Sequence, residues 1–392
     1  MNFPVLQLKV KRERSILLKH PWIFSGGLEK LPKAKEGDVV EVRSFGGDVL
    51  GYGFYAEKSQ ISCRMFDWSD KPSAFDQPEY WAQKIKQALL LRKIIIGAKT
   101  NAYRLLHAEG DFMPGVIADV YAGVVVLQLL VKGTEQRKGA LIEAFRMNGF
   151  EAIYLKTKAS SQNIEAVDSV SGWISGGGEG KVRIEENGIR FGVDFIDGQK
   201  TGFFIDQRDN RELLKSLSKG KKVLNTFCYT GGFSVYALAG GASEVHSVDI
   251  SAEAVRMSEE NVQLNFPNAP HKGITADCFD FLKEMPDQEY DIIILDPPAF
   301  AKNARSVDNA TRGYKQINMR AIKKLKPGGL LFTFSCSQNI SKDLFQKIIF
   351  GAAADVGRNV RIIHQLHQPA DHPINIYHPE GEYLKGLVLW IE

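Results

Sequence analysis

Cysteine is scarce in this sequence, because the 392 residues contain only four, at positions 63, 228, 278 and 336. They lie far apart, and no two of them form the CxxC pair that is common in structural zinc sites. The spacing argues against a zinc site and a disulfide framework, and it favours a reducing compartment. We therefore expect a protein without a bound metal ion.

Long hydrophobic runs are absent as well. No segment contains the roughly 18 consecutive apolar residues that a membrane-spanning helix requires, and the N-terminus lacks the pattern of a signal peptide. These absences predict a cytoplasmic protein that does not bind membranes.

A strong excess of charge is also missing, since 50 Lys and Arg are balanced by 46 Asp and Glu, for a net charge of +4. Most of the excess lies in residues 1–75, which contain 12 Lys and Arg and 9 Asp and Glu, so that 12 − 9 = +3. Such a bias favours a polyanionic partner, although a solvated basic surface would give the same count.

The chain does contain enough apolar sequence for several domains. Its 392 residues, 44% hydrophobic and 24% charged, allow two or three domains with well-filled cores. Residues 1–75 predict a small β-rich domain, because candidate strands at 39–42, 49–55 and 61–66 are separated by glycine turns. Pro72 and Ser73 indicate a linker, and helical periodicity predicts a helix over 78–96.

The segment 76–195 predicts a central α+β domain. Candidate strands lie at 115–120, 123–130, 152–156, 181–186 and 190–195, and a further helix near 135–147. The stretch 170–180 is rich in glycine and serine, which predicts a loop.

Residues 196–392 predict an α/β domain with a parallel, doubly wound sheet, because apolar strands alternate with helical segments. The expected strands are 222–226, 244–249, 290–295 and 329–334, with a last strand over 382–391. The expected helices are 232–240, 251–264, 278–284, 313–325 and 341–354.

A glycine turn follows the first of these strands, in the run TFCYTGGFS at 226–234. Glycines at this switch point let the backbone approach a cofactor closely, although a plain tight turn would look the same. The run is not GxGxxG and carries no phosphate-binding lysine. The cofactor therefore has no pyrophosphate, which favours S-adenosylmethionine over NAD.

Two acidic residues follow at the ends of the next elements. Asp249 lies 249 − 231 = 18 residues after Gly231, the distance at which a carboxylate bonds the ribose hydroxyls of a cofactor. It would also suit a helix N-cap, but Ser251 can perform that role and leaves Asp249 free for the ligand. Asp277 is placed to accept a hydrogen bond from an adenine amino group, and capping the helix at 278–284 is the competing interpretation.

The strand expected over 290–295 is followed by the run DPPAF, at 296–300. Its two prolines forbid a helix there, so they hold Asp296 rigidly beside the expected sulfonium group. Phe300 could support a flipped-out base by stacking. The run is typical of methyltransferases that act on a planar, nitrogen-bearing group.

Cys336 follows the strand expected over 329–334, and it is expected to lie beside Asp296. A thiolate that adds to carbon 6 of cytosine makes carbon 5 nucleophilic enough to take a methyl group, while Asp296 holds the exocyclic amine and the ring nitrogen. A nearby carboxylate makes ionisation of the thiol harder, so we expect basic help from Lys302 or Lys315. The competing interpretation is that Cys336 is a small buried hydrophobic residue, as we expect for Cys63, Cys228 and Cys278.

A basic segment, residues 301–315, lies between these two strands. Lys302, Arg312 and Lys315 are suited to holding RNA phosphates at the mouth of the site, although a solvated loop followed by a helix would have the same composition.

These runs resemble the ribosomal RNA large subunit methyltransferase I family, which makes 5-methylcytosine in bacterial 23S ribosomal RNA. The resemblance covers nearly the whole chain, and its motifs occur in one order. They are HPWIF at 20–24, GFFIDQR at 202–208, FCYTGGFS at 227–234, LDPP at 295–298, TFSCS at 333–337, HP at 372–373 and EYLKG at 382–386.

The resemblance implies an N-terminal PUA domain that binds RNA, a central α+β domain and a Rossmann-like class I methyltransferase domain, assembled as a homodimer. It implies S-adenosylmethionine as cofactor, and it matches Cys336 to the nucleophile. Pro297, in the DPPAF run, is expected to contact the substrate. The residues it assigns to the cofactor are Phe204, Asp206, Gln207, Phe227, Tyr229, Thr230, Gly231, Asp249, Asp277, Cys278 and Asp296.

The chain departs from most RNA cytosine carbon-5 methyltransferases at one position. These enzymes have a further cysteine after the proline that follows Asp296, where this chain has Pro298 or Ala299. The base that removes the carbon 5 proton is therefore not identified.

Three other functions compete with this one. A methyltransferase acting on an exocyclic nitrogen would use Asp296 and the prolines without Cys336. A non-catalytic RNA-binding protein would have lost cofactor residues, yet Asp249, Asp277 and Asp296 are all present. A protein methyltransferase would leave the basic N-terminal domain unexplained.

Overall fold

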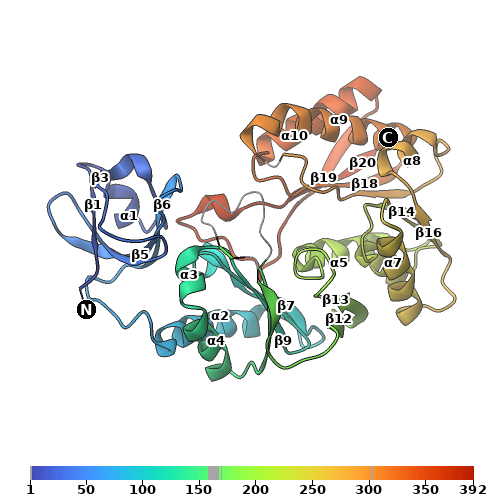
Figure 1. Cartoon of the computed structure of the whole chain (residues 1–392). Helices are drawn as coiled ribbons and strands as arrows, with labels where there is room; N and C mark the ends of the chain where they lie inside the picture. The colour runs from blue at the N-terminus through green and yellow to red at the C-terminus, as the bar shows by residue number, and fades with distance from the viewer. Residues whose placement is uncertain (1, 158–166, 169, 302) are drawn as a thin grey trace. The chain divides into compact units, whose positions relative to one another are not determined.

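The computed structural model describes residues 2–157, 167–168, 170–301 and 303–392 (Figure 1). The chain folds into two compact units. The N-terminal unit contains Met1–Ile184, Val193–Gly202 and Ala370–Gly381, and the C-terminal unit contains Glu185–Gly192, Phe203–Pro369 and Glu382–Glu392. The domain boundaries expected near residues 75 and 195 stay predictions.

A six-stranded sheet forms the first part of the N-terminal unit, in the order β2-β6-β5-β4-β1-β3. Its elements are β1 (Val5–Leu8), α1 (Arg14–Leu17), β2 (Trp22–Phe24), η1 (Ser25–Gly27), β3 (Leu28–Lys30), β4 (Val39–Arg43), β5 (Val49–Tyr55) and β6 (Ile61–Asp67). The alternating pattern predicted β4, β5 and β6, whereas β1, β2 and β3 are too short to show a period. Gly53 is required in β5, because a Cβ there would lie 2.4 Å from Cys63 Sγ.

A five-stranded sheet follows, in the order β11-β10-β9-β8-β7. Its elements are α2 (Pro78–Ile95), β7 (Ala102–His107), η2 (Ala108–Asp111), β8 (Val116–Tyr121), β9 (Val124–Leu129), α3 (Lys132–Gln136), α4 (Lys138–Met147), β10 (Ala152–Lys156) and β11 (Ser171–Ser175). The loop predicted over 170–180 is wrong in its first half, because β11 pairs antiparallel with β10 despite its glycine and serine content. Phe75, next to the predicted linker, is buried in a core that residues of both sheets share.

A two-stranded hairpin, β12 (Lys181–Glu186) and β13 (Ile189–Asp194), leads toward the second unit. Its turn belongs to the C-terminal unit, where Glu186 is completely buried. Arg211 donates to both carboxylate oxygens of Glu186, at 2.9 and 2.7 Å, and Tyr236 donates to Oε1 at 3.0 Å. These hydrogen bonds fix the hairpin turn to the C-terminal unit.

The C-terminal unit is built on a seven-stranded sheet in the order β16-β15-β14-β17-β18-β20-β19. The first five strands in this order are parallel, and β20 is antiparallel to both β18 and β19. The strands are β14 (Lys222–Thr226), β15 (Glu244–Asp249), β16 (His271–Thr275), β17 (Ile292–Leu295), β18 (Gly329–Ser335), β19 (Val360–His367) and β20 (Lys385–Ile391). The prediction of an entirely parallel sheet is therefore corrected at its far edge.

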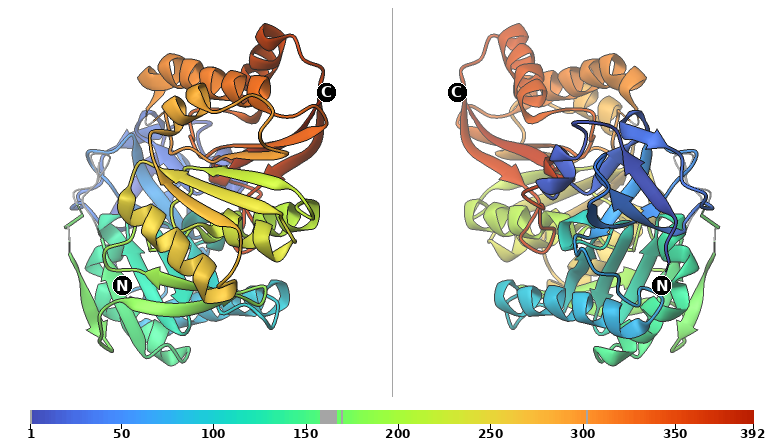
Figure 2. Two further views of the ribbon diagram at one scale, coloured as in Figure 1. Left: turned by 90° about the vertical axis from the view of Figure 1, so that its right-hand side faces the viewer. Right: turned by 90° about the vertical axis from the view of Figure 1, so that its left-hand side faces the viewer.

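Helices cover both faces of this sheet, with α9 and α10 on one face and α7 on the other (Figures 1 and 2). They are η3 (Ile205–Gln207), α5 (Arg208–Leu217), α6 (Gly232–Ala239), α7 (Ala252–Asn265), α8 (Cys278–Glu284), η4 (Ala304–Ser306), α9 (Val307–Lys324), α10 (Lys342–Val356) and, in the segment of the N-terminal unit, η5 (Pro379–Gly381). Helix α9 begins six residues before the predicted start at 313, because its first turns are too polar to show an apolar period. In the described part of the chain, no helix is long and apolar enough to span a membrane.

Candidate active site

The loop after β14 has an unusual backbone. Phe227, Tyr229 and Gly231 have φ values of +54°, +44° and +76°, so that left-handed residues alternate along it. Such a conformation is costly for residues other than glycine, and it is concentrated where a loop must present its backbone to a ligand. At Gly231 the space is also closed, because a Cβ there would lie 2.2 Å from Ser258 Oγ. Thr230 is buried, and its carbonyl accepts a hydrogen bond from Asn261 at 2.9 Å.

Asp249, at the end of β15, faces this loop. Its Oδ2 accepts from the Tyr229 amide and its Oδ1 from the Ser251 amide, each at 3.0 Å. Ser251 caps α7 by accepting from the Ala254 amide at 3.2 Å. The expected cap is therefore present, but Asp249 is not left free, since each of its oxygens holds one backbone amide. A carboxylate oxygen accepts more than one hydrogen bond, so a half-exposed Asp249 still has acceptor capacity for ribose hydroxyls.

Asp277 and Cys278 lie at the start of α8. Asp277 Oδ1 accepts from the amides of Phe279 and Asp280, at 2.8 and 3.1 Å, so the competing interpretation as a helix cap is what the structure shows. Cys278 is buried, and its Sγ accepts from the Phe227 amide at 3.2 Å. Burial raises the pKa of this thiol to about 12. Cys278 therefore supports the cofactor loop as a packing residue, and a contact between Asp277 and adenine stays a prediction.

The run after Gly202 brings three predicted residues to the same edge of the sheet. Phe204 packs edge-on against the ring of Tyr229, with centroids 5.2 Å apart. Asp206 Oδ2 accepts from the Tyr383 hydroxyl at 2.7 Å. Gln207 Nε2 donates to Asp296 Oδ2 at 3.0 Å. Tyr383 belongs to the family motif at 382–386, but the sequence alone does not indicate that it contacts Asp206.

Gln207 itself is held in place, since its Oε1 accepts from Asn210 Nδ2 at 2.6 Å. An amide whose oxygen is already bonded must present its nitrogen to Asp296, so the orientation of that carboxylate is fixed from two sides, by Gln207 and by the proline run. Gln207 is 3% exposed and acts in this structure as a positioning residue for Asp296. Asn210, which no sequence pattern singled out, completes the chain of contacts.

The residues after Asp296 are less open than expected. Pro297 is buried, and the ring of Phe300 packs against Tyr314 with centroids 4.6 Å apart. Phe300 is half-buried and part of the core beside α9, so the structure shows it supporting the strand end. Lys302 lies outside the described residues.

The two other basic residues expected at the mouth of the site lie on α9. Arg312 is exposed in its second turn. Lys315 forms an ion pair with Asp355 of α10, with 2.7 Å between Nζ and Oδ2. That pair occupies Lys315 on the α9–α10 face, so the structure does not show the expected contact between Lys315 and Cys336.

Cys336 follows the last residue of β18, and it is the one cysteine of the four that is not buried. The pairing of Leu295 with Thr333 places Asp296 and Cys336 just beyond the same edge of neighbouring parallel strands. Ser335 and Ser337 point to the buried side, where both hydroxyls lie 3.0 Å from the Tyr314 hydroxyl. Because side chains alternate in extended chain, this arrangement leaves Cys336 on the other, more open side.

Lys385, at the start of β20, pairs across the sheet with Ser335 of β18. Its Nζ donates to the carbonyls of Ser337 and Ile340, at 2.7 and 2.6 Å. Burial lowers the pKa of Lys385 to about 8, and a thiolate at Cys336 would raise it. Lys385 belongs to the family motif at 382–386, but the sequence did not show that it contacts the turn after Cys336.

The donor groups of this edge fit S-adenosylmethionine. Carboxylates follow three of the four strands β16, β15, β14 and β17, and the loop of residues 226–234, after β14, contains no lysine or arginine for a phosphate. Such a set suits a nucleoside with a positively charged sulfonium group, which supplies a methyl group when bound. Within the described residues, no group of three or more His, Cys, Asp or Glu side chains could hold a metal ion.

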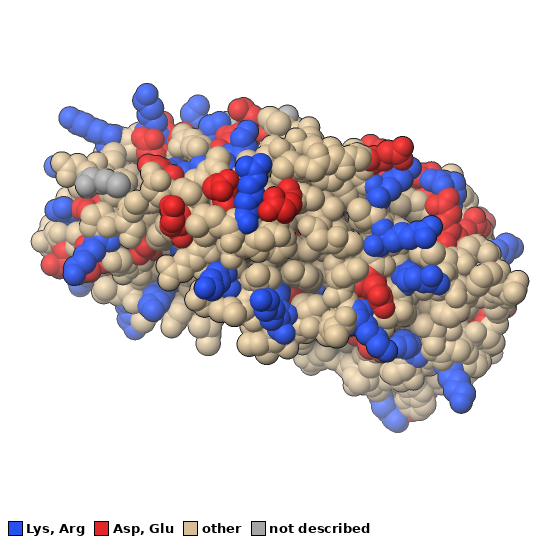
Figure 3. Space-filling model, turned by 90° about the horizontal axis from the view of Figure 1, so that it is seen from below, with Lys and Arg blue, Asp and Glu red and all other residues tan. Residues whose placement is uncertain are grey.

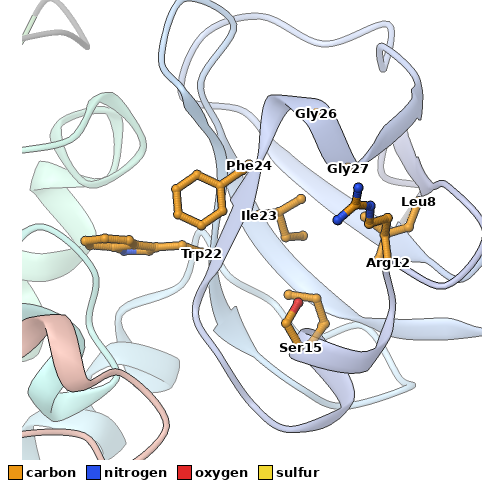
Figure 4. A pocket seen from close by; sticks show the side chains of 9 residues that line it. Leu8, Arg12, Ser15, Trp22, Ile23, Phe24, Gly26 and Gly27 are labelled. Atoms are coloured by element: carbon orange, nitrogen blue, oxygen red, sulfur yellow. The ribbon is translucent and has the colours of Figure 1, made fainter.

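A pocket lies on the six-stranded sheet of the N-terminal unit. A pocket of about 200 Å³ is lined by residues that include Leu8, Arg12, Ser15 and Ile23 (Figure 4). In Figure 4, Ile23 points toward Arg12 and Ser15, whereas Trp22 projects the other way, as alternation along β2 requires. On the face of the molecule in Figure 3, Lys and Arg side chains are interspersed with Asp and Glu side chains.

Comparison with known proteins matches two family models. An S-adenosylmethionine-dependent methyltransferase model matches residues 103–380, and a PUA-like domain model matches residues 6–68. Among solved structures, a candidate S-adenosylmethionine-dependent methyltransferase from Streptococcus mutans superposes with a TM-score of 0.84 at 25% identity, over 98% of this chain and 99% of that one. A candidate methyltransferase complexed with SAH gives a TM-score of 0.85 at 26% identity, with the same coverage.

Curated relatives are more similar in sequence. The protein named ribosomal RNA large subunit methyltransferase I from Shewanella frigidimarina is 42% identical over 391 residues, which cover 98% of each chain. The protein of the same name from Vibrio cholerae is 41% identical over 392 residues, again 98% of each chain. The fold class and cofactor inferred from the sequence are confirmed, and the chain belongs to the ribosomal RNA large subunit methyltransferase I family of S-adenosylmethionine-dependent methyltransferases.

Proposed function

We propose that this protein methylates carbon 5 of a cytosine in 23S ribosomal RNA. The observation that carries the proposal is the position of Cys336, half-buried beyond the carboxyl end of β18, the strand next to the one that Asp296 follows. The names of the curated relatives support a large-subunit ribosomal RNA as the substrate.

The chemistry follows from these two side chains. The Cys336 thiolate adds to carbon 6 of the cytosine, and the ring electrons move to carbon 5, which takes the methyl group. Asp296 holds the exocyclic amine and the ring nitrogen while charge develops on the ring, and Gln207 keeps that carboxylate in one orientation. Loss of the carbon 5 proton then expels the thiolate and restores the aromatic ring.

RNA binding is proposed for the surface around the N-terminal pocket. Lys9, Lys11, Arg12, Arg14 and Lys19 all lie within 11 residues of the chain, and all five are exposed. Clustered cations of this kind bind phosphates, and Arg12 also lines the pocket, which is large enough for a planar base. Replacing Arg12 and Arg14 by glutamine should weaken RNA binding and reduce its dependence on salt, as measured by filter binding at several salt concentrations.

A cytoplasmic homodimer belongs to the same proposal, which the family resemblance supports. Light scattering on purified protein tests the dimer, since the mass of one chain is 43.7 kDa. Fractionation of cells tests the location.

Nucleoside mass spectrometry tests the reaction. Purified 23S RNA is incubated with labelled S-adenosylmethionine and either the wild-type protein or Cys336→Ala. Label in 5-methylcytosine that disappears with the variant supports both the product and the nucleophile. Label in an N-methylated base that persists with the variant would instead assign the protein to the exocyclic-nitrogen class, which needs Asp296 and the prolines but no thiol.

A further inference from the structure

Two large side chains are exposed at the tip of a turn in the N-terminal unit, at residues 375–378. Ile376 is 84% exposed and Tyr377 is 41% exposed, whereas Asn375 and His378 on either side of them are buried. A single exposed apolar residue is common on protein surfaces, but two adjacent ones between buried residues open a continuous apolar area to a ligand. The proposed function as stated above gives this turn no role.

Hydrogen bonds and a ring contact fix the turn to the rest of the N-terminal unit. The His378 amide donates to the Asn375 carbonyl at 2.7 Å, and the Tyr377 amide donates to Asn375 Oδ1 at 3.0 Å. Asn375 Nδ2 in turn donates to the Glu109 carbonyl at 3.2 Å. The His378 ring packs against Trp22 of β2, with centroids 4.3 Å apart. The tip is therefore held in one conformation, so that little conformational entropy is lost when a ligand binds it.

A cation lies next to the exposed tip. Lys19 Nζ is 6.0 Å from the centre of the Tyr377 ring. Lys19 is also one of the five exposed lysines and arginines at residues 9–19, which form the surface proposed above to bind RNA. An aromatic ring, an aliphatic side chain and a cation in contact are the groups that bind unpaired nucleotides, since the base stacks on the ring and the phosphate meets the cation.

We propose that the turn at residues 375–378 binds an unpaired nucleotide of the substrate RNA. The base stacks on the ring of Tyr377, Ile376 packs against the same base or its neighbour, and Lys19 binds a phosphate. The cations at residues 9–19 favour a polyanion over a second copy of this chain as the occupant. The inference rests on the proposed function and deepens it, because it adds a segment near the end of the chain to the RNA-binding surface.

Filter binding of 23S RNA to the full-length protein, at several salt concentrations, tests this contact. Tyr377→Ala should weaken binding about 10- to 100-fold without changing the salt dependence, because it removes one stacked base and no charge. Tyr377→Phe should bind as the wild type does, since it keeps the ring. Ile376→Ser should weaken binding less than Tyr377→Ala. Lys19→Gln should lower the slope of log affinity against log salt by about 0.7, as loss of one phosphate contact to a single strand does.

Ile94→Ser is the matched control for Ile376→Ser, because Ile94, on α2 of the same unit, is 82% exposed. The control should bind 23S RNA with wild-type affinity, and an equal loss in both variants would overturn the proposal. Wild-type affinity in Tyr377→Ala would overturn it as well. A change of molecular mass in Ile376→Ser, measured by light scattering, would assign the turn to a contact between copies instead. Should Tyr377→Ala fail to fold, irradiation of the wild-type protein on 23S RNA that contains 5-iodouridine decides. Crosslinks at Tyr377 support the contact, and their absence contradicts it.

These readouts do not depend on the RNA product. Weakened binding by Tyr377→Ala together with an N-methylated base would retain the RNA contact and reject the proposed cytosine chemistry. Unchanged binding together with 5-methylcytosine, lost in Cys336→Ala, would retain the proposed function and reject the role of the turn.

Discussion

Cys278 and Cys336 both lie beyond the carboxyl ends of parallel strands in one sheet, the first beside the cofactor loop and the second beside Asp296. The Cys278 thiol is 3% exposed, accepts from a backbone amide and has a pKa of about 12. The Cys336 thiol is half-buried and lies near a buried lysine. Two residues of one type in similar sequence positions thus differ because Cys278 is enclosed and holds a backbone amide, whereas Cys336 is partly open.

The largest expected effect comes from exchanging these two thiols for alanine. Cys336→Ala should reduce methyl transfer by roughly 10³-fold or more while S-adenosylmethionine still binds, because the variant loses only the nucleophile. Cys278→Ala should retain activity and lower the free energy of unfolding by about 1–2 kcal/mol, since it leaves a small cavity. Single-turnover methylation and urea unfolding measure the two outcomes. Near-normal turnover by Cys336→Ala would show that Cys336, like Cys278, is not the nucleophile.

A smaller effect is expected for a pair of aspartates. Asp249→Ala should weaken S-adenosylmethionine binding about 10- to 100-fold, because Asp249 both accepts the ribose hydroxyls and holds the Tyr229 amide. Asp277→Ala should mainly remove the cap of α8, at about 1 kcal/mol of stability. Calorimetric titration with S-adenosylmethionine measures the cofactor affinity of each variant and so distinguishes the two roles. Equal losses of affinity would show that Asp277 also contacts the cofactor.

The smallest expected effect is a dependence of the protein's stability on pH, which arises from His271 on β16. Burial lowers the pKa of His271, on β16, to about 4, and its Nε2 lies 2.7 Å from Ser247 Oγ. Because the folded protein then binds fewer protons than the unfolded chain between about pH 4 and 6.5, stability falls as the pH drops through that window. At pH 5.5 the loss relative to pH 7.5 should be roughly 1 kcal/mol in urea unfolding, and His271→Gln should flatten that difference. If His271→Gln loses as much stability as the wild type between pH 7.5 and pH 5.5, His271 is not the source of the pH dependence.

The sequence predicted best what is encoded locally. The strand β17 was found because a buried parallel strand is a continuous apolar run, and β14 and β15 because short runs with apolar residues precede helical segments. Asp249 and Asp296 could be read at the same time, because they stand at the ends of β15 and β17 in the sequence. The strands β16 and β19 were missed as elements, the first because it is short and polar, the second because it is an edge strand with most side chains exposed. Helix α5 was missed because most of its residues are charged or polar.

The contacts that orient the site were harder to predict. Tyr383 meets Asp206, and Lys385 meets the turn after Cys336, across 177 and 48 residues of sequence. Both contacts depend on β20 running antiparallel to β18, a register that no local pattern reveals. The basic help expected for Cys336 was therefore assigned to Lys302 or Lys315, of which the first lies outside the described residues and the second is paired with Asp355.

The segment Ala370–Gly381 sets an order for folding during synthesis, because it belongs to the N-terminal unit although it follows nearly all of the C-terminal one. The Asp371 carboxylate accepts from the Arg104 amide and its carbonyl from Arg92, both at 2.9 Å, and Arg92 is 1% exposed. Without this segment, the Arg92 guanidinium and the Arg104 amide lose these hydrogen-bond acceptors. The first domain to leave the ribosome therefore stays incomplete until almost the last residues have emerged, and expression of the first 200 residues alone should give a poorly folded product.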